Sequence, residues 1–204
     1  MGKGIFDLEK NFAQYGAYHN NKTNIIIHTI FVWPILFTTL LLLYFTPPFI
    51  PIPPLLATAL PFSLGNILLL NFGFVSVIIY AFFYICLDVV SGTLASILLV
   101  ACWVGSSILG DALEFSLAWK VISVCQVVCW CAQFVGHGVF EKRAPALLDN
   151  LVQAFLMAPF FVLLEVLLKL FRYEPYPGFG TRVQKVIDYN ISEWKKTNKY
   201  KKST

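Results

Sequence analysis

The chain carries no lysine or arginine across the 97 residues from Thr23 to Trp119. Long charged side chains normally cover the surface of a soluble protein, so such a stretch cannot form the surface of one. Apolar residues make up 58% of the chain and charged residues 13%, against about 45–50% and about 25% in soluble domains. The sequence therefore predicts an all-α fold, a polytopic helical bundle embedded in a lipid bilayer.

Six apolar segments follow one another along the chain, and their number bears on topology. If all six crossed the membrane, His28 and His137 would lie on opposite sides. We expect instead about four full crossings plus two re-entrant or interfacial segments, which return the chain at His137 to its starting side. The expected crossings are residues 25–45, 72–90, 93–109 and 117–136, and the partial segments are residues 55–71 and 147–171. Irregular backbone at membrane depth must pack on protein or line a cavity, so this topology also predicts a cavity.

The basic residues are concentrated at the C-terminal end. Nine of the fifteen lysines and arginines lie between Lys169 and Lys202, and basic clusters beside a membrane favour the cytosolic face. We therefore expect residues 1–172 to form a single membrane-embedded catalytic domain and residues 173–204 a basic cytosolic tail, with the N-terminus also cytosolic. Nucleic acid is not an expected partner, because the aromatic residues lie in the apolar segments and are not interleaved with the basic tail.

The final residues, Lys201-Lys202-Ser203-Thr204, resemble the di-lysine retrieval signal of endoplasmic reticulum membrane proteins. This resemblance predicts the endoplasmic reticulum membrane as the location. A lysine-rich tail that simply ends this way is the alternative interpretation.

Two of the three histidines surround the polar run of residues 20–24, just before the first apolar segment. In one continuous helix His19 and His28, nine residues apart, would point in opposite directions. The Asn and Thr residues of the run favour turns and caps, and Thr23 or Asn24 is a plausible N-cap for the helix that follows. A break in the run would let the segment of His19 fold back toward His28.

The third histidine, His137, lies between two glycines at the end of another apolar segment. Gln133, His137 and Glu141 are spaced four residues apart and would share one face of an α-helix, which Pro145 would end near residue 144. The flanking glycines leave room for another backbone or a ligand to approach.

Two or three histidines, with or without a carboxylate, are typical of a mononuclear non-haem Fe(II) site, and zinc accepts the same donors. Three histidines are too few for a di-iron membrane hydroxylase or desaturase. The alternative is that each imidazole is only an amphipathic group at a membrane interface.

The segment from Gln133 to Gln153, QFVGHGVFEKRAPALLDNLVQ, resembles the hallmark of the fungal 2-hydroxy fatty acid (2-hydroxy-palmitic acid) dioxygenase family. So do Tyr18-His19-Asn20 and the segment from Asn24 to His28, and the resemblance covers residues 1 to about 172. Such proteins lie in the endoplasmic reticulum membrane and perform α-oxidation of 2-hydroxy fatty acids with Fe(II), which in yeast serves phytosphingosine breakdown. The resemblance implies that O2 is consumed and that the fatty acid product is one carbon shorter.

The family's histidines carry over to His19, His28 and His137 as metal ligands. Spacing adds Glu141 as a catalytic group: a fourth ligand, a partner that fixes the His137 tautomer, or a base for the 2-hydroxyl. Lys142 or Arg143 could pair with the substrate carboxylate, or could serve only as cytosolic anchors. A zinc-dependent membrane lipid hydrolase and a non-catalytic membrane-shaping protein are the alternative functions.

Overall fold

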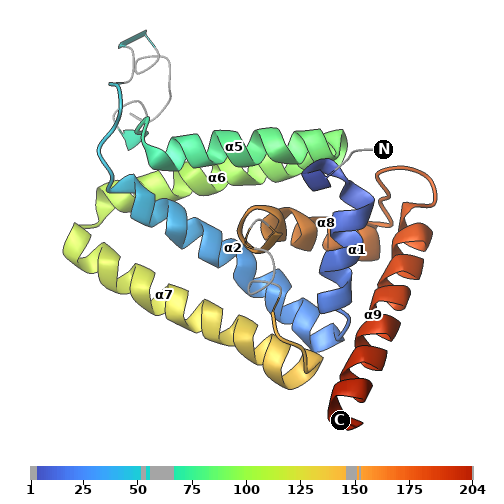
Figure 1. Cartoon of the computed structure of the whole chain (residues 1–204). Helices are drawn as coiled ribbons and strands as arrows, with labels where there is room; N and C mark the ends of the chain where they lie inside the picture. Colours follow the sequence, from blue (N-terminus) through green and yellow to red (C-terminus); the bar gives the residue numbers. More distant parts are fainter. Residues whose placement is uncertain (1–3, 52–53, 56–66, 146–150, 152, 204) are drawn as a thin grey trace. The chain divides into compact units, whose positions relative to one another are not determined.

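The computed structural model describes residues 4–51, 54–55, 67–145, 151 and 153–203 (Figure 1). Its regular elements are all helical, as the sequence predicts. The α-helices are α1 (Leu8–Tyr18), α2 (Lys22–Tyr44), α5 (Phe72–Leu87), α6 (Val89–Ala112), α7 (Phe115–Val135), α8 (Ala158–Phe171) and α9 (Phe179–Ser203). A 3₁₀ turn at Gly4–Phe6 and π-helical turns at Gly136–Glu141 and Gln153–Met157 complete the described elements.

Four helical stretches are long and apolar enough to cross a membrane: Lys22–Tyr44, Val89–Ala112, Phe115–Glu141 and Ala154–Phe171. These helices make the protein an all-α membrane bundle. The stretch 154–171, expected to insert only partly, has 18 residues, whereas Phe72–Leu87, expected to cross, has 16. Pro159 lies in the first turn of α8, where a missing backbone N–H does not interrupt the helix. The predicted partial segment 55–71 falls mostly on residues 56–66, outside the described residues.

The chain forms two compact units, residues 30–132 and residues 1–29 together with 133–204. In the first unit, α5 and α6 lie side by side, and in sequence they are separated by the single residue Asp88 (Figure 1). Asp88 ends α5 and caps α6 by accepting a hydrogen bond from the Ser91 N–H at 2.8 Å. Gly92 lies against the Tyr84 carbonyl, where a β-carbon would collide. Because of this tight turn, α5 ends at Leu87, three residues before the end of the predicted 72–90 crossing.

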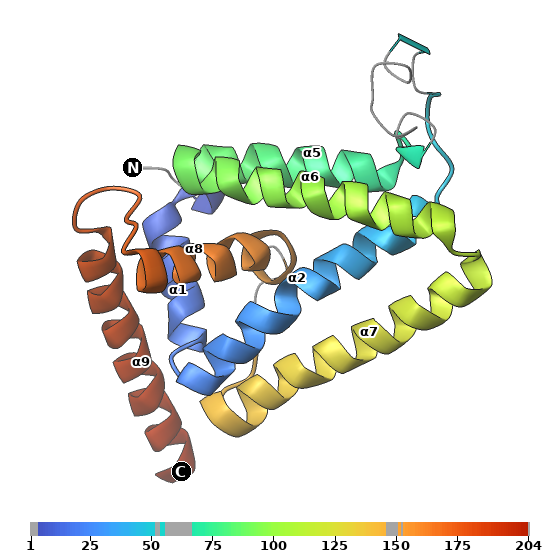
Figure 2. The same cartoon turned by 180° about the vertical axis from the view of Figure 1, so that it is seen from behind.

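The second unit contains α1, α8 and α9, and α9 lies beside α1 in both views (Figure 2). The ring of Phe12 is 5.4 Å from that of Phe161 in α8 and 5.7 Å from that of Phe179 in α9. The Glu9 carboxylate accepts hydrogen bonds from Tyr176 and Arg182, both at 3.0 Å. Residues 173–204, expected as a basic tail, therefore include a helix that packs on α1, and the domain boundary at 172 stays a prediction.

Candidate metal centre

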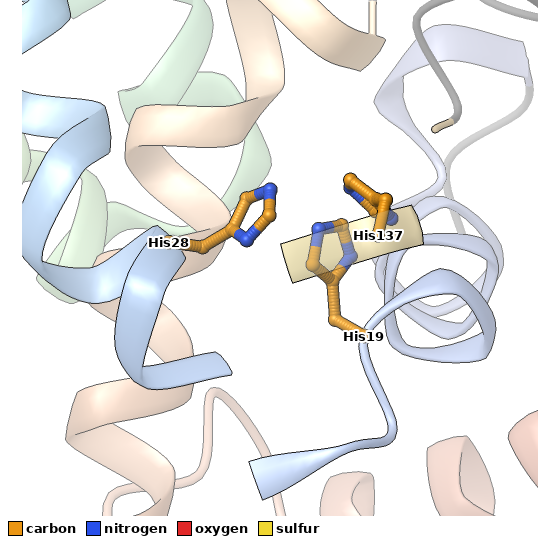
Figure 3. Close-up of side chains that lie close together, drawn as sticks. All are labelled: His19, His28 and His137. Atoms are coloured by element: carbon orange, nitrogen blue, oxygen red, sulfur yellow. The ribbon is translucent and has the colours of Figure 1, made fainter. Parts of the chain in front are cut away.

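The second unit brings the three histidines of the chain together (Figure 3). His19 follows the last residue of α1, His28 lies in the second turn of α2, and His137 lies in the π-helical turn after α7. Their exposed fractions are 8%, 5% and 4%, so all three are buried. The ring centroids are 4.3 Å (His19–His28), 4.9 Å (His19–His137) and 4.8 Å (His28–His137) apart. Three imidazoles from three different segments thus lie in one group.

Backbone carbonyls fix the tautomers of two of these rings. The Nδ1 of His19 lies 2.8 Å from the Tyr15 carbonyl oxygen, and that of His28 lies 2.9 Å from the Asn24 carbonyl oxygen. A carbonyl oxygen can only accept, so in both rings Nδ1 carries the hydrogen and Nε2 keeps its lone pair. In metalloproteins a histidine ligand commonly donates its other ring N–H in this way.

Two ring nitrogens of the cluster are buried without a hydrogen-bond partner, Nε2 of His19 and Nδ1 of His137. An unsatisfied buried polar atom costs about 1–3 kcal/mol, so such atoms are rare and point to a missing ligand. One potential ligand nitrogen from each ring lies within 4.8 Å of the others. Two nitrogens bound at about 2.1 Å to the same ion lie roughly 3–4 Å apart, so a group of this size is compatible with a single metal ion.

The surroundings keep His19 neutral. Burial lowers the pKa of His19 well below its usual 6.5, and the nearby His28 and His137 rings lower it further. Metal ions bind the neutral imidazole, so the site holds this ring in its ligating form without competition from protons at neutral pH.

The π-helical turn changes what the sequence spacing implied. In Gly136–Glu141 each backbone hydrogen bond spans one residue more than in an α-helix, so Gln133, His137 and Glu141 do not follow the regular α-helical spacing. The turn ends at Lys142, which adopts a left-handed conformation (φ 54°), rather than near residue 144 as predicted. Gly136 touches Asn24 Oδ1 so closely that no β-carbon fits there. The glycine thus lets the turn that carries His137 approach α2.

Glu141 lies outside the group of three histidines and binds the segment between α1 and α2 and the first turn of α2. Its carboxylate accepts hydrogen bonds from the N–H of Asn20 (3.1 Å), the N–H of Asn21 (2.9 Å) and the side-chain amide of Asn24 (3.1 Å). Asn21 also caps α2 by accepting from the Thr23 N–H at 2.9 Å, so the cap lies two residues before Thr23, the earlier of the two predicted caps. Glu141 thereby connects the segments that carry all three histidines.

The two predicted carboxylate-binding residues are placed differently from each other. The Arg143 guanidinium donates to the Ala17 carbonyl oxygen at 2.8 Å and lies 3.5 Å from the centre of the Tyr18 ring. Lys142 is exposed. The structure therefore gives Arg143 contacts that hold α1, and the assignment of either residue to the substrate stays a prediction.

The sequence reasoning missed Tyr15. Its ring stacks on His19 at a centroid distance of 4.1 Å, and its hydroxyl donates to Glu165 of α8 at 3.0 Å. Lys169 donates to the other oxygen of the same carboxylate at 2.7 Å. Tyr15 and Asn24 each precede a histidine by four residues, and this repeated spacing within a helix is the signal that could have identified them.

Comparison with known proteins identifies the family of the chain. The family model described as "2-hydroxy-palmitic acid dioxygenase Mpo1-like" matches residues 5–170, a range that includes all three histidines. The chain is 34% identical over 194 residues to the 2-hydroxy-palmitic acid dioxygenase MPO1 of Saccharomyces cerevisiae, covering 94% of this chain and 93% of the yeast protein. No solved structure matches the chain. The match to the family model over most of the chain, together with this similarity, shows that the protein belongs to the Mpo1-like family.

Proposed function

We propose that the protein is an Fe(II)-dependent dioxygenase that converts 2-hydroxy fatty acids into fatty acids one carbon shorter. The observation that carries the proposal is the buried group His19, His28 and His137 in a chain of the Mpo1-like family. The name of the yeast relative supplies the substrate class and the reaction type. The apolar helices fit a substrate that is delivered from a lipid bilayer.

His19, His28 and His137 would hold the iron. Bound Fe(II) supplies the redox chemistry by which O2 oxidises a 2-hydroxy acid. The protein supplies the other requirements. The carbonyls of Tyr15 and Asn24 hold two rings in the ligating tautomer, and burial of the cluster keeps bulk water from the reacting groups.

Glu141 acts in this proposal as a positioning residue. Its carboxylate already accepts from the N–H groups of Asn20 and Asn21, between His19 and α2, and from the side-chain amide of Asn24 in the first turn of α2. In this proposal these bonds set the spacing of the ligands. A role as a fourth ligand or as a base would require it to leave these donors.

We further propose that the reaction serves the breakdown of the phytosphingosine base in the endoplasmic reticulum membrane, with both termini cytosolic. The resemblance of the histidine motifs to the fungal family supports the pathway. The nine basic residues between Lys169 and Lys202 support the orientation.

The experiment is anaerobic purification in detergent, reconstitution with Fe(II) or Zn(II), and measurement of O2 uptake with 2-hydroxypalmitate. The proposal predicts a product one carbon shorter and O2 consumption with iron only, lost in His19→Ala, His28→Ala and His137→Ala variants whose helical content is unchanged. Turnover of the zinc form without O2, or no turnover with iron, would refute it.

A further inference from the structure

A cavity of about 370 Å³ lies among α1, α8 and α9 and reaches His19. Apolar side chains that include Phe12, Leu168, Val183 and Ile187 form part of its wall. The volume is within the range of about 300–1,000 Å³ that small-molecule sites occupy. We call this space the His19 cavity.

Most charged groups of the His19 cavity already have partners. The Glu165 carboxylate accepts from Tyr15 and Lys169. The Glu174 carboxylate accepts from the N–H groups of Gly178 (2.9 Å) and Gly180 (3.0 Å). Both acids are therefore satisfied by donors on the protein.

Arg172 differs from these groups. It lines the cavity at the C-terminal cap of α8 and is exposed. In the described part of the chain its guanidinium has no ion pair within 4 Å and no hydrogen bond. The other cation of the cavity lining, Lys169, is paired with Glu165, so Arg172 is the one that can bind an anion there. An arginine can bind a carboxylate through two parallel hydrogen bonds.

At the His19 end, the cavity reaches the metal-ligand group. His19 lines the cavity, and its Nε2 is buried without a partner. A polar end at a histidine and an apolar wall match the two ends of a 2-hydroxy acid, its polar head and its alkyl chain, and Arg172 supplies a cation for the carboxylate of that head.

We infer that the His19 cavity is the binding site for the head of the 2-hydroxy fatty acid, whose carboxylate pairs with Arg172. The identity of this ligand rests on the proposed function. Arg172 takes the place that the sequence suggested for Lys142 or Arg143, because Arg143 is engaged by Ala17 and Tyr18.

The test compares Arg172→Gln with Lys185→Gln in the iron-loaded protein. Lys185 is an exposed lysine of α9 outside the cavity lining, so its replacement removes the same charge from the same unit. Loss of a charged hydrogen-bonded pair, worth about 1.5–3 kcal/mol, predicts a KM about 10- to 100-fold higher in Arg172→Gln and an unchanged KM in Lys185→Gln. Inhibition by a 1,2-diol of the same length, which lacks the carboxylate, should be equal in all three proteins.

An unchanged KM in Arg172→Gln, an equal rise in Lys185→Gln, or an equal loss of diol affinity would overturn the inference. Arg172 has φ 55°, so Arg172→Asn, a residue that tolerates this conformation, replaces the glutamine variant if that variant fails to fold.

Binding of labelled 2-hydroxypalmitate to the zinc-loaded protein without O2 separates this inference from the proposed function. If wild type binds the acid more tightly than Arg172→Gln but never turns it over with iron, the inference holds and the function fails. If wild type turns it over and both proteins bind it equally, the inference alone fails.

Discussion

Replacing Glu141 with alanine tests how the three ligand-bearing segments are held in register. The carboxylate accepts from the N–H groups of Asn20 and Asn21 and from the amide of Asn24, residues 117 to 121 positions away in sequence. Asn24 is fully buried, and its carbonyl holds the His28 ring. Loss of the carboxylate therefore leaves the buried Asn24 amide with the Tyr18 carbonyl as its remaining acceptor and frees the turn that follows His19.

The size of the effect follows from the two part-buried hydrogen bonds, those of Asn21 and Asn24. A hydrogen bond to a charged group contributes about 1.5–3 kcal/mol, and the lower value for each gives a loss of about 3 kcal/mol in the free energy of unfolding. The contacts that orient metal ligands typically contribute about 10- to 100-fold to metal affinity. We expect a decrease of that order in Glu141→Ala, and a smaller one in Glu141→Gln, which keeps one acceptor oxygen.

Urea unfolding in detergent measures the first quantity, and competition with a chromogenic chelator measures the second. A positioning role predicts that stability and metal affinity fall together, and that saturating Fe(II) restores much of kcat. Unchanged stability and metal affinity with a kcat that iron does not restore would refute this reasoning and would favour a base.

Three further predictions concern the contacts around the cluster. Gly136→Ala should weaken metal binding by about 10-fold or more, because its β-carbon would displace Asn24; chelator competition measures this, and an unchanged affinity would show that the close approach is not needed. Tyr15→Phe keeps the stacking on His19 but removes the hydroxyl bound to Glu165. The free energy of unfolding, measured in urea, should fall by about 1–2 kcal/mol while metal affinity changes little. A large loss of metal affinity would contradict the idea that this hydroxyl stabilises the fold without orienting the metal ligands. The pKa of His19 is lowered in the folded state, so the unfolded chain takes up the proton first as the pH falls. The free energy of unfolding of the metal-free protein should therefore decrease below pH 6.5, and it should decrease less in His19→Gln. An equal dependence of the free energy of unfolding on pH in the two proteins would refute this prediction.

Two features of the sequence predicted that the histidines meet: a polar run between His19 and His28, and an even number of expected crossings between His28 and His137. The structure brings the three rings together. The crossing count stays a prediction, because the described helices Lys22–Tyr44, Val89–Ala112 and Phe115–Glu141 are long and apolar enough to span a membrane, whereas α5 has only 16 residues. Helix ends were less accurate, since α2 begins at Lys22 rather than residue 25. A helix can extend past its apolar run when a residue such as Asn21 caps it.

The partners of Glu141 and Tyr15 could not be predicted in the same way. Glu141 reaches Asn20 across 121 positions, and Tyr15 reaches Glu165 across 150. The π-helical turn that aims Glu141 leaves no periodic signal, because one extra residue in a turn is invisible in a short sequence. Such contacts depend on how the helices pack against one another, and the spacing of neighbouring residues in the sequence does not predict that packing.

The most direct test is the metal content of the purified protein after anaerobic Fe(II) reconstitution and removal of free metal. One ion per chain in wild type, lost in each of His19→Ala, His28→Ala and His137→Ala while helical content is retained, is the result that a shared three-histidine site predicts. Equal metal in wild type and in any one of the three folded variants would show that the missing histidine is not a ligand and would contradict the shared site.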